Sequence, residues 1–122
     1  MRMWALVLAL GGLILAGSAA AARGPTLLER TAITRAMPLF VRQYPVGCVS
    51  LSMIVSRDGR WARVGADYLI EPGYPKSDPC LRYASNGFWI LEKFVHWKVV
   101  FNGSDAPRCS LGAPKEISGG CR

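Results

Sequence analysis

The sequence predicts an α+β domain in which one N-terminal amphipathic helix packs on a four-stranded antiparallel meander sheet. Three observations lead to this fold class: apolar residues at helical spacing near the start, apolar residues in alternation after position 48, and four cysteines. A single helix followed by consecutive strands is typical of the α+β class.

The first segment is predicted to be a secretory signal peptide. Arg2 gives it a positive start, the run 4–15 is almost entirely apolar, and small residues follow. The apolar run is shorter than the roughly 20 residues that a membrane-spanning helix needs. We therefore expect residues 1–22 to be removed, with the cut between Ala20 and Arg23.

The mature chain is expected to be one secreted domain over residues 23–122, extracellular or periplasmic, without stable membrane insertion. Removal of Arg2 takes the formal charge from +7 to +6. This excess favours anionic neighbours such as wall polymers, lipid headgroups or acidic proteins, although solvated surface charge that aids solubility is the more common reason for such an excess. The basic residues form no tight run, so nucleic acid is not indicated as a partner.

All four cysteines, Cys48, Cys80, Cys109 and Cys121, lie in the predicted mature chain. An even count in an exported chain predicts two disulfides. No pair has CxxC spacing and the chain has one histidine, so neither a metal site nor a cofactor is expected. A meander brings the first three cysteines to one end, which favours Cys80–Cys109 with Cys48–Cys121 and leaves the other two pairings open.

The helix is predicted to begin at Thr26, because Thr26 and Glu29 have the spacing of a capping box. The apolar residues that follow recur at intervals of three and four, as in a helix with one buried face. They are Ile33, Ala36, Met37, Phe40, Val41 and Tyr44. Pro38 predicts a kink or an early end, since it lacks a backbone donor.

Four strands are predicted from alternation and from aromatic and β-branched residues. They cover roughly residues 49–55, 62–68, 88–91 and 97–101. Asp58-Gly59 predicts a two-residue hairpin turn with positive φ angles between the first two strands. The Pro-rich and Gly-rich stretch 71–87 is predicted to be a long connection.

The turn between the last two strands contains Phe94 and Val95 instead of Gly, Asn or Asp. Because β-branched Val95 is disfavoured at positive φ, we expect either a longer loop over residues 93–96 or a β-bulge. The two hairpins look alike when Trp97 is aligned with Trp61, but this similarity does not indicate a duplication.

Several short motifs resemble those of small exported bacterial proteins without an assigned function. They are Asn86-Gly87-Phe88, Trp97-Lys98-Val99-Val100-Phe101-Asn102-Gly103-Ser104, Cys109, and Gly59-Arg60-Trp61-Ala62-x-Val64. The resemblance covers roughly residues 33–121, and it implies a secreted, disulfide-bonded, cystatin-like or NTF2-like domain without implying an activity. Those relatives commonly have Gly-Arg or Gly-Lys before the second tryptophan, where this chain has Val95-His96.

The chain lacks the residue sets of common hydrolytic mechanisms, so we expect no enzymatic activity. His96 has no Gly-x-Ser-x-Gly elbow to serve, and oxidised cysteines offer no thiolate. Asp67 and Glu71 are close enough in sequence for an acid/base pair, but they are more simply explained as charges at the sheet rim.

The candidate partner-binding residues lie at the two predicted hairpin tips, where aromatic and cationic side chains suit protein contacts. They are Arg57, Arg60, Trp61, Arg63, Phe94, Val95 and His96. Phe94 is either exposed to a partner or folded back over the sheet edge. His96 is a turn residue packed on Trp97, a pH-sensitive contact, or a catalytic base.

Three functions are compatible with these features. The leading hypothesis is a non-catalytic exported binding domain whose tips contact a protein or an anionic cell-envelope component. A peptidase inhibitor with an exposed loop over residues 72–80 is one alternative, and an NTF2-like pocket between helix and sheet, holding Asp67 and His96, is the other. Core side chains that fill this space would argue against the pocket, namely Met37, Phe40, Leu51 and Met53.

Overall fold

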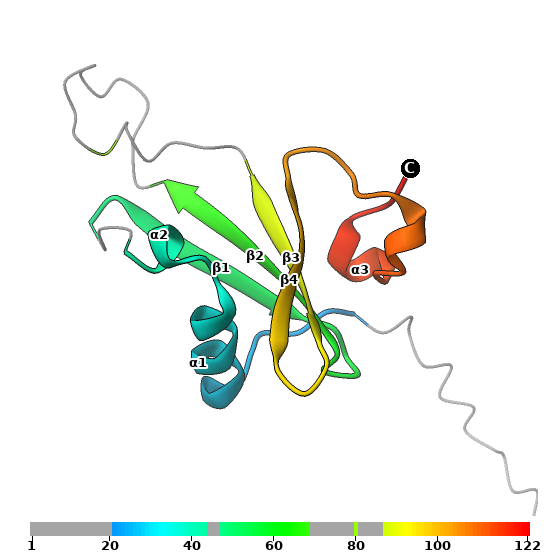
Figure 1. Ribbon diagram of the computed structural model, residues 1–122, viewed down its shortest axis with the longest axis horizontal. Coiled ribbons are helices and arrows are strands. Elements are labelled where there is room, and N and C mark those ends of the chain that lie inside the picture. Colours follow the sequence, from blue (N-terminus) through cyan, green and yellow to red (C-terminus); the bar gives the residue numbers. More distant parts are fainter. Residues whose placement is uncertain (1–20, 44–46, 69–79, 81–86) are drawn as a thin grey trace, which may run out of the picture.

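The computed structural model describes residues 21–43, 47–68, 80 and 87–122, and these form an α+β fold (Figure 1). The elements are α1 (Leu27–Ala36), α2 (Leu39–Arg42), β1 (Val49–Val55), β2 (Trp61–Tyr68), β3 (Phe88–Lys93), β4 (Trp97–Gly103), η2 (Cys109–Leu111) and α3 (Lys115–Ser118). The strands form one antiparallel sheet in the order β1-β2-β3-β4, which confirms the predicted meander. Among the described residues, no helix has the length and apolar character needed to cross a membrane.

Helix α1 begins with the capping box that the sequence predicts. The Thr26 hydroxyl accepts a hydrogen bond from the Glu29 amide at 3.1 Å, and the Glu29 carboxylate accepts one from the Thr26 amide at 2.9 Å. The helix ends at Ala36, and α2 starts after Pro38, which has no amide hydrogen to continue the helical bonding. The predicted helix is therefore two short helices.

The two helices cover one face of the sheet. Ile33, Met37 and Val41 are buried against strand residues that include Met53 and Trp97. Leu51 is partly buried against the same cluster. Phe40, which the helical spacing places in this core, is instead 57% exposed on α2, because the break at Pro38 changes the direction of the chain.

The C-terminal segment covers the opposite face, for which the sequence pattern predicts no covering element (Figure 1). Ile117 of α3 is fully buried against Trp61 and Ile90. Arg63 holds this segment by donating from Nη1 to the carbonyl oxygens of Ile117 and Ser118, at 3.1 and 3.2 Å. The sheet is thus enclosed between two small hydrophobic clusters.

The structure confirms two disulfides but shows that the favoured pairing, Cys80–Cys109 with Cys48–Cys121, is wrong. Cys48 bonds to Cys80 and Cys109 bonds to Cys121, with Cα atoms 5.0 and 4.8 Å apart. The second pair closes because the tail folds back on itself. The Cys109 amide donates to the Arg122 carbonyl at 3.1 Å. Cys109 and Cys121 are therefore local partners, and Cys48, at the start of β1, is left for Cys80.

The β1–β2 turn differs from the predicted two-residue turn. Ser56 and Trp61 are still paired, with the Ser56 amide 2.8 Å from the Trp61 carbonyl oxygen, so the loop covers residues 57–60. Gly59 has a φ of 74°, whereas Asp58 has no positive φ. The Gly59 amide donates to the Ser56 carbonyl at 2.9 Å, which closes the turn one residue earlier than predicted.

The β3–β4 turn is the longer loop that was one of the two alternatives. Lys93 pairs with Trp97, and the loop over residues 94–96 is closed by a 3.0 Å bond from the Phe94 amide to the His96 carbonyl. No residue other than glycine has a positive φ in the described chain, so Val95 avoids the expected strain. The pairing of β3 with β4 is irregular in register between Ile90 and Leu91, which lie in β3 and not in the turn.

Candidate binding site at the hairpin tips

Both hairpin tips and the start of α1 lie at one end of the molecule (Figure 1). Antiparallel pairing requires the β1–β2 and β3–β4 turns to lie at the same end of a meander. The start of α1 joins them because Arg23 exchanges both backbone hydrogen bonds with Val55, the last residue of β1, at 2.8 and 2.7 Å. We call this part of the molecule, residues 26–28, 57–60 and 93–96, the tip end.

The polar groups of the first tip form hydrogen bonds with one another. Ser56 is 1% exposed, and its hydroxyl donates to the Asp58 carboxylate and accepts from the Trp61 amide at 2.9 Å. Asp58 also accepts from the Arg60 amide at 3.0 Å. The bond from Ser56, followed by the bond from Arg60, lowers the pKa of Asp58 from its ordinary value. This loop is held in one conformation by its own side chains.

The two tips are joined to each other. The Lys93 amide donates to the Arg60 carbonyl at 2.7 Å. The Arg60 guanidinium forms an ion pair with Glu92 of β3 at 2.8 Å. Arg57 is exposed beside them. The tips therefore form a connected surface and not two independent loops.

Two of the candidate residues do not lie on this surface. Trp61 is 7% exposed and belongs to the cluster under the C-terminal segment. The Arg63 guanidinium lies 3.8 Å from the centre of the Phe88 ring and binds α3 carbonyls. Because side chains two apart on a strand share one face, both lie on the face of the sheet that the C-terminal segment covers. Trp97 pairs with Lys93 and faces the first cluster, so Trp61 and Trp97 are not equivalent.

The second tip presents apolar side chains to solvent. Phe94 is 59% exposed and Val95 is 86% exposed, so Phe94 does not fold back over the sheet edge. His96 is exposed, and its backbone carbonyl closes the turn.

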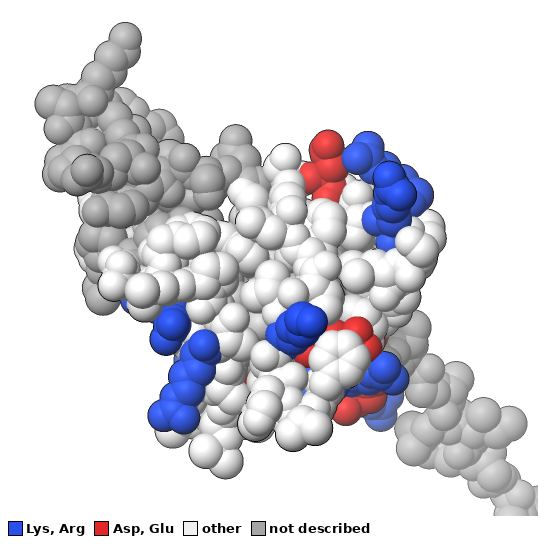
Figure 2. Space-filling view, viewed as in Figure 1, with Lys and Arg blue, Asp and Glu red and all other residues white. Residues whose placement is uncertain are grey.

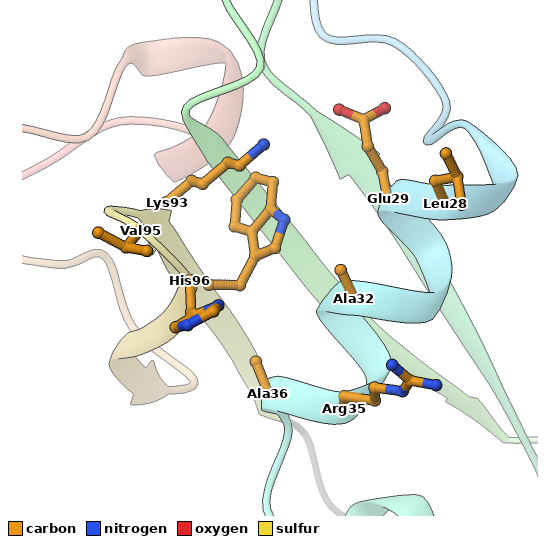
Figure 3. Close-up of a pocket in the computed structure, with 9 residues that line it drawn as sticks. Leu28, Glu29, Ala32, Arg35, Ala36, Lys93, Val95 and His96 are labelled. Carbon is orange, nitrogen blue, oxygen red and sulfur yellow. The ribbon is translucent and has the colours of Figure 1, made fainter.

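A groove of about 480 Å³ runs between α1 and the second tip (Figure 3). Leu28, Ala32 and Ala36 line it from α1, and Lys93, Val95 and His96 line it from the hairpin. Residues four apart share one side of a helix, and the two small alanine side chains leave the space open. Leu28 is 83% exposed and Val95 is 86% exposed, and both line the groove, Leu28 from α1 and Val95 from the hairpin.

The charges around the groove are predominantly positive. Its carboxylate, Glu29, is held by the Arg23 guanidinium at 2.6 and 3.0 Å, and this bond is the main cause that lowers the Glu29 pKa to about 2. Arg35 and Lys93 also line the groove, and in the part of the chain that the structure describes neither forms an ion pair. Figure 2 shows basic side chains over α1 beside an uncharged surface.

The catalytic candidates are not brought together. Asp67 pairs with Ser50 near the end of β2 that is remote from the tips, whereas His96 lies at the tip end. Glu71 and the loop 72–79 lie outside the described residues. Within the described ranges, no three acidic, cysteine or histidine side chains gather in a way that could hold a metal ion.

Sequence reasoning missed the contribution of α1 to this surface. Leu27 and Leu28, 81% and 83% exposed, precede the apolar stripe that packs on the sheet. The sequence signal that could have identified them is an apolar pair in the first turn of a helix whose buried face begins only at Ile33. The pairing of Arg23 with Val55, a contact distant in sequence, is what brings this first turn beside the tips.

Comparison with protein-family models, curated proteins and solved structures found no match.

Proposed function

We propose that the chain is a non-catalytic exported binding domain whose tip end contacts an anionic component of the cell envelope. The observation that carries this proposal is the pair Leu28 and Val95, which stand 83% and 86% exposed on the two walls of a positively charged groove. Concave sites lined by apolar side chains with a few polar groups are typical of binding surfaces.

The rigidity of the surface supports binding. The two tips are tied together by the bond from the Lys93 amide to the Arg60 carbonyl and by the ion pair between Arg60 and Glu92. A surface that is ordered before binding loses less conformational entropy when a partner arrives.

The charge distribution supports an anionic partner. Glu29 and Glu92 at this end are each paired with an arginine, which leaves Lys93 and Arg35 to act on a ligand. Clefts lined by one sign of charge attract ligands of the opposite sign.

Export and the finer fold class are parts of the same proposal. The predicted leader and two disulfides are typical of chains that work outside the reducing cytoplasm. One helical layer followed by a four-stranded meander suits a cystatin-like or NTF2-like domain.

No described feature favours either alternative function, the NTF2-like pocket or the peptidase inhibitor. The space between helices and sheet, where an NTF2-like pocket would lie, contains the buried side chains of Ile33, Met37 and Met53. The inhibitor loop over residues 72–80 lies, apart from Cys80, outside the described residues.

Cosedimentation of the processed protein with cell-envelope fractions tests the proposal. We expect binding that falls at least about tenfold when Leu28→Ser and Val95→Ser are combined, because two exposed apolar contacts are lost. Leu39→Ser on α2, where Leu39 is 59% exposed away from the tips, is the matched control. Equal sedimentation of the double variant and the wild type would reject the proposed surface.

A further inference from the structure

We propose that the component bound by the tip end is the surface of a lipid bilayer rich in anionic headgroups, which the protein contacts peripherally. This inference rests on the proposed function and names its partner. Four exposed apolar side chains, Leu27, Leu28, Phe94 and Val95, enter the interface, and the neighbouring cations face the headgroup phosphates.

The positions of the apolar residues favour a broad surface over a peptide seated in the groove. Leu28 and Val95 line the groove, but Leu27 and Phe94 do not, although they are 81% and 59% exposed. A peptide in the groove leaves those two side chains in water. The start of α1 and the β3–β4 tip project at the same end of the molecule, so a flat surface meets both (Figure 1).

The basic residues are suited to lipid headgroups. Lys93 and Arg35 line the groove, and Arg30 and Arg57 are exposed on α1 and the first tip. Long basic side chains keep their charge at the headgroups while their alkyl portions cover apolar surface. A lysine or arginine near an anionic bilayer strengthens binding about fivefold.

Arg23, which directly follows the predicted leader, lies beside the tip end. Arg23 is fixed to Val55 at the end of β1, beside the first tip. The apolar run of the predicted leader precedes Arg23 in the sequence, so the leader joins the domain at the tip end.

A second copy of the chain is a poorer occupant of the same surface. The predicted mature domain carries a formal charge of +6, and two such surfaces in contact bring Lys93 and Arg35 of each copy together. Like charges in contact oppose association. Binding to an acidic protein is the remaining alternative, and the vesicle experiment distinguishes it from binding to lipid.

Vesicle binding tests the inference on the processed protein, with its N-terminus verified by mass so that no leader remains. Vesicles of phosphatidylglycerol and phosphatidylcholine are compared with vesicles of phosphatidylcholine alone. We expect binding at least about tenfold tighter to the anionic vesicles, and weaker in high salt because charges are screened. Leu28→Ser with Val95→Ser, and separately Arg35→Gln with Lys93→Gln, each weaken binding at least about tenfold.

The matched controls are Leu39→Ser and Arg42→Gln on α2, which we expect to bind like the wild type. Insertion is measured independently with Val95→Trp, because Trp61, Trp89 and Trp97 are all buried and respond little to lipid. We expect a blue-shifted emission and quenching by brominated lipid.

Three results would overturn this inference, and the first of them separates it from the proposed function. Binding to envelope fractions that depends on Leu28 and Val95, without binding to anionic vesicles, overturns the lipid inference and retains a protein or polymer partner. Absence of binding to both overturns both. Vesicle binding that the tip variants and the controls weaken equally also overturns the inference, since it indicates adsorption by net charge alone.

Discussion

The two hairpin tips lie side by side, yet they use their side chains in opposite ways. The β1–β2 tip is rich in internal bonds, with Ser56 buried as a central hydroxyl and Gly59 in the left-handed region. The β3–β4 tip is closed by one backbone bond and directs Phe94 and Val95 into solvent. The difference suggests that the first tip stabilises the fold and the second is free to bind.

The largest expected effect is on the first tip. Ser56→Ala removes the acceptor of the Trp61 amide and the donor to Asp58, which leaves a buried amide unsatisfied. We expect a loss of about 2–3 kcal/mol in the free energy of unfolding, measured by urea denaturation. Ser104→Ala, at an exposed serine after β4, is the control and should change it little. A loss equal to that of the control would contradict the role of Ser56.

Gly59→Ala tests the backbone of the same tip. Gly59 has a φ of 74°, and a side chain there disfavours the left-handed conformation. We expect destabilisation of about 1–2 kcal/mol from strain alone, because the nearest atoms to an added Cβ, on Arg23 and Glu29, are 3.7 and 3.8 Å away. Thermal unfolding measures it, and an unchanged Tm would show that this loop relaxes freely.

Glu29 gives the start of α1, beside the first tip, a pH-dependent stability. Its folded pKa of about 2 lies below its ordinary value of 4.5, mainly because of Arg23. The stabilisation is therefore complete above about pH 4.5 and is lost as pH falls toward 2. Glu29→Gln should flatten this part of the stability profile, by on the order of 1 kcal/mol for a partly exposed pair. If the variant loses stability at low pH just as the wild type does, this loss arises from groups other than Glu29.

The smallest expected effect is on the second tip. Since no residue of this loop has a positive φ, Val95→Gly relieves no strain and should destabilise by about 0.5 kcal/mol or less. Phe94→Ser should lie within the same range, because Phe94 is 59% exposed. Clear stabilisation by Val95→Gly in urea denaturation would show that the turn is strained after all.

The contrast between the tips also explains what the sequence could predict. The strands, the meander and the capping box at Thr26 depend on neighbours in sequence, and local patterns identified them. The Ser56 network and the reversal of the tail depend on contacts over several residues, so the two-residue turn and the favoured disulfide pairing were both wrong.

The candidate site was predicted in part for the same reason. Alternation and turn composition identified Arg57, Phe94, Val95 and His96 as tip residues, and the structure has them exposed. The sequence does not show that Trp61 and Arg63 turn to the second face, where the C-terminal segment covers them. Nor does it show that Leu28 stands across a groove from Val95.

One paired measurement tests the division between the tips most directly. Binding to envelope fractions and the urea midpoint are measured for Ser56→Ala and for Leu28→Ser with Val95→Ser, under conditions where all the proteins are folded. The account predicts that the first variant lowers the midpoint and keeps its binding, and that the second keeps its midpoint and binds at least about tenfold more weakly. Undiminished binding by the second variant would contradict it.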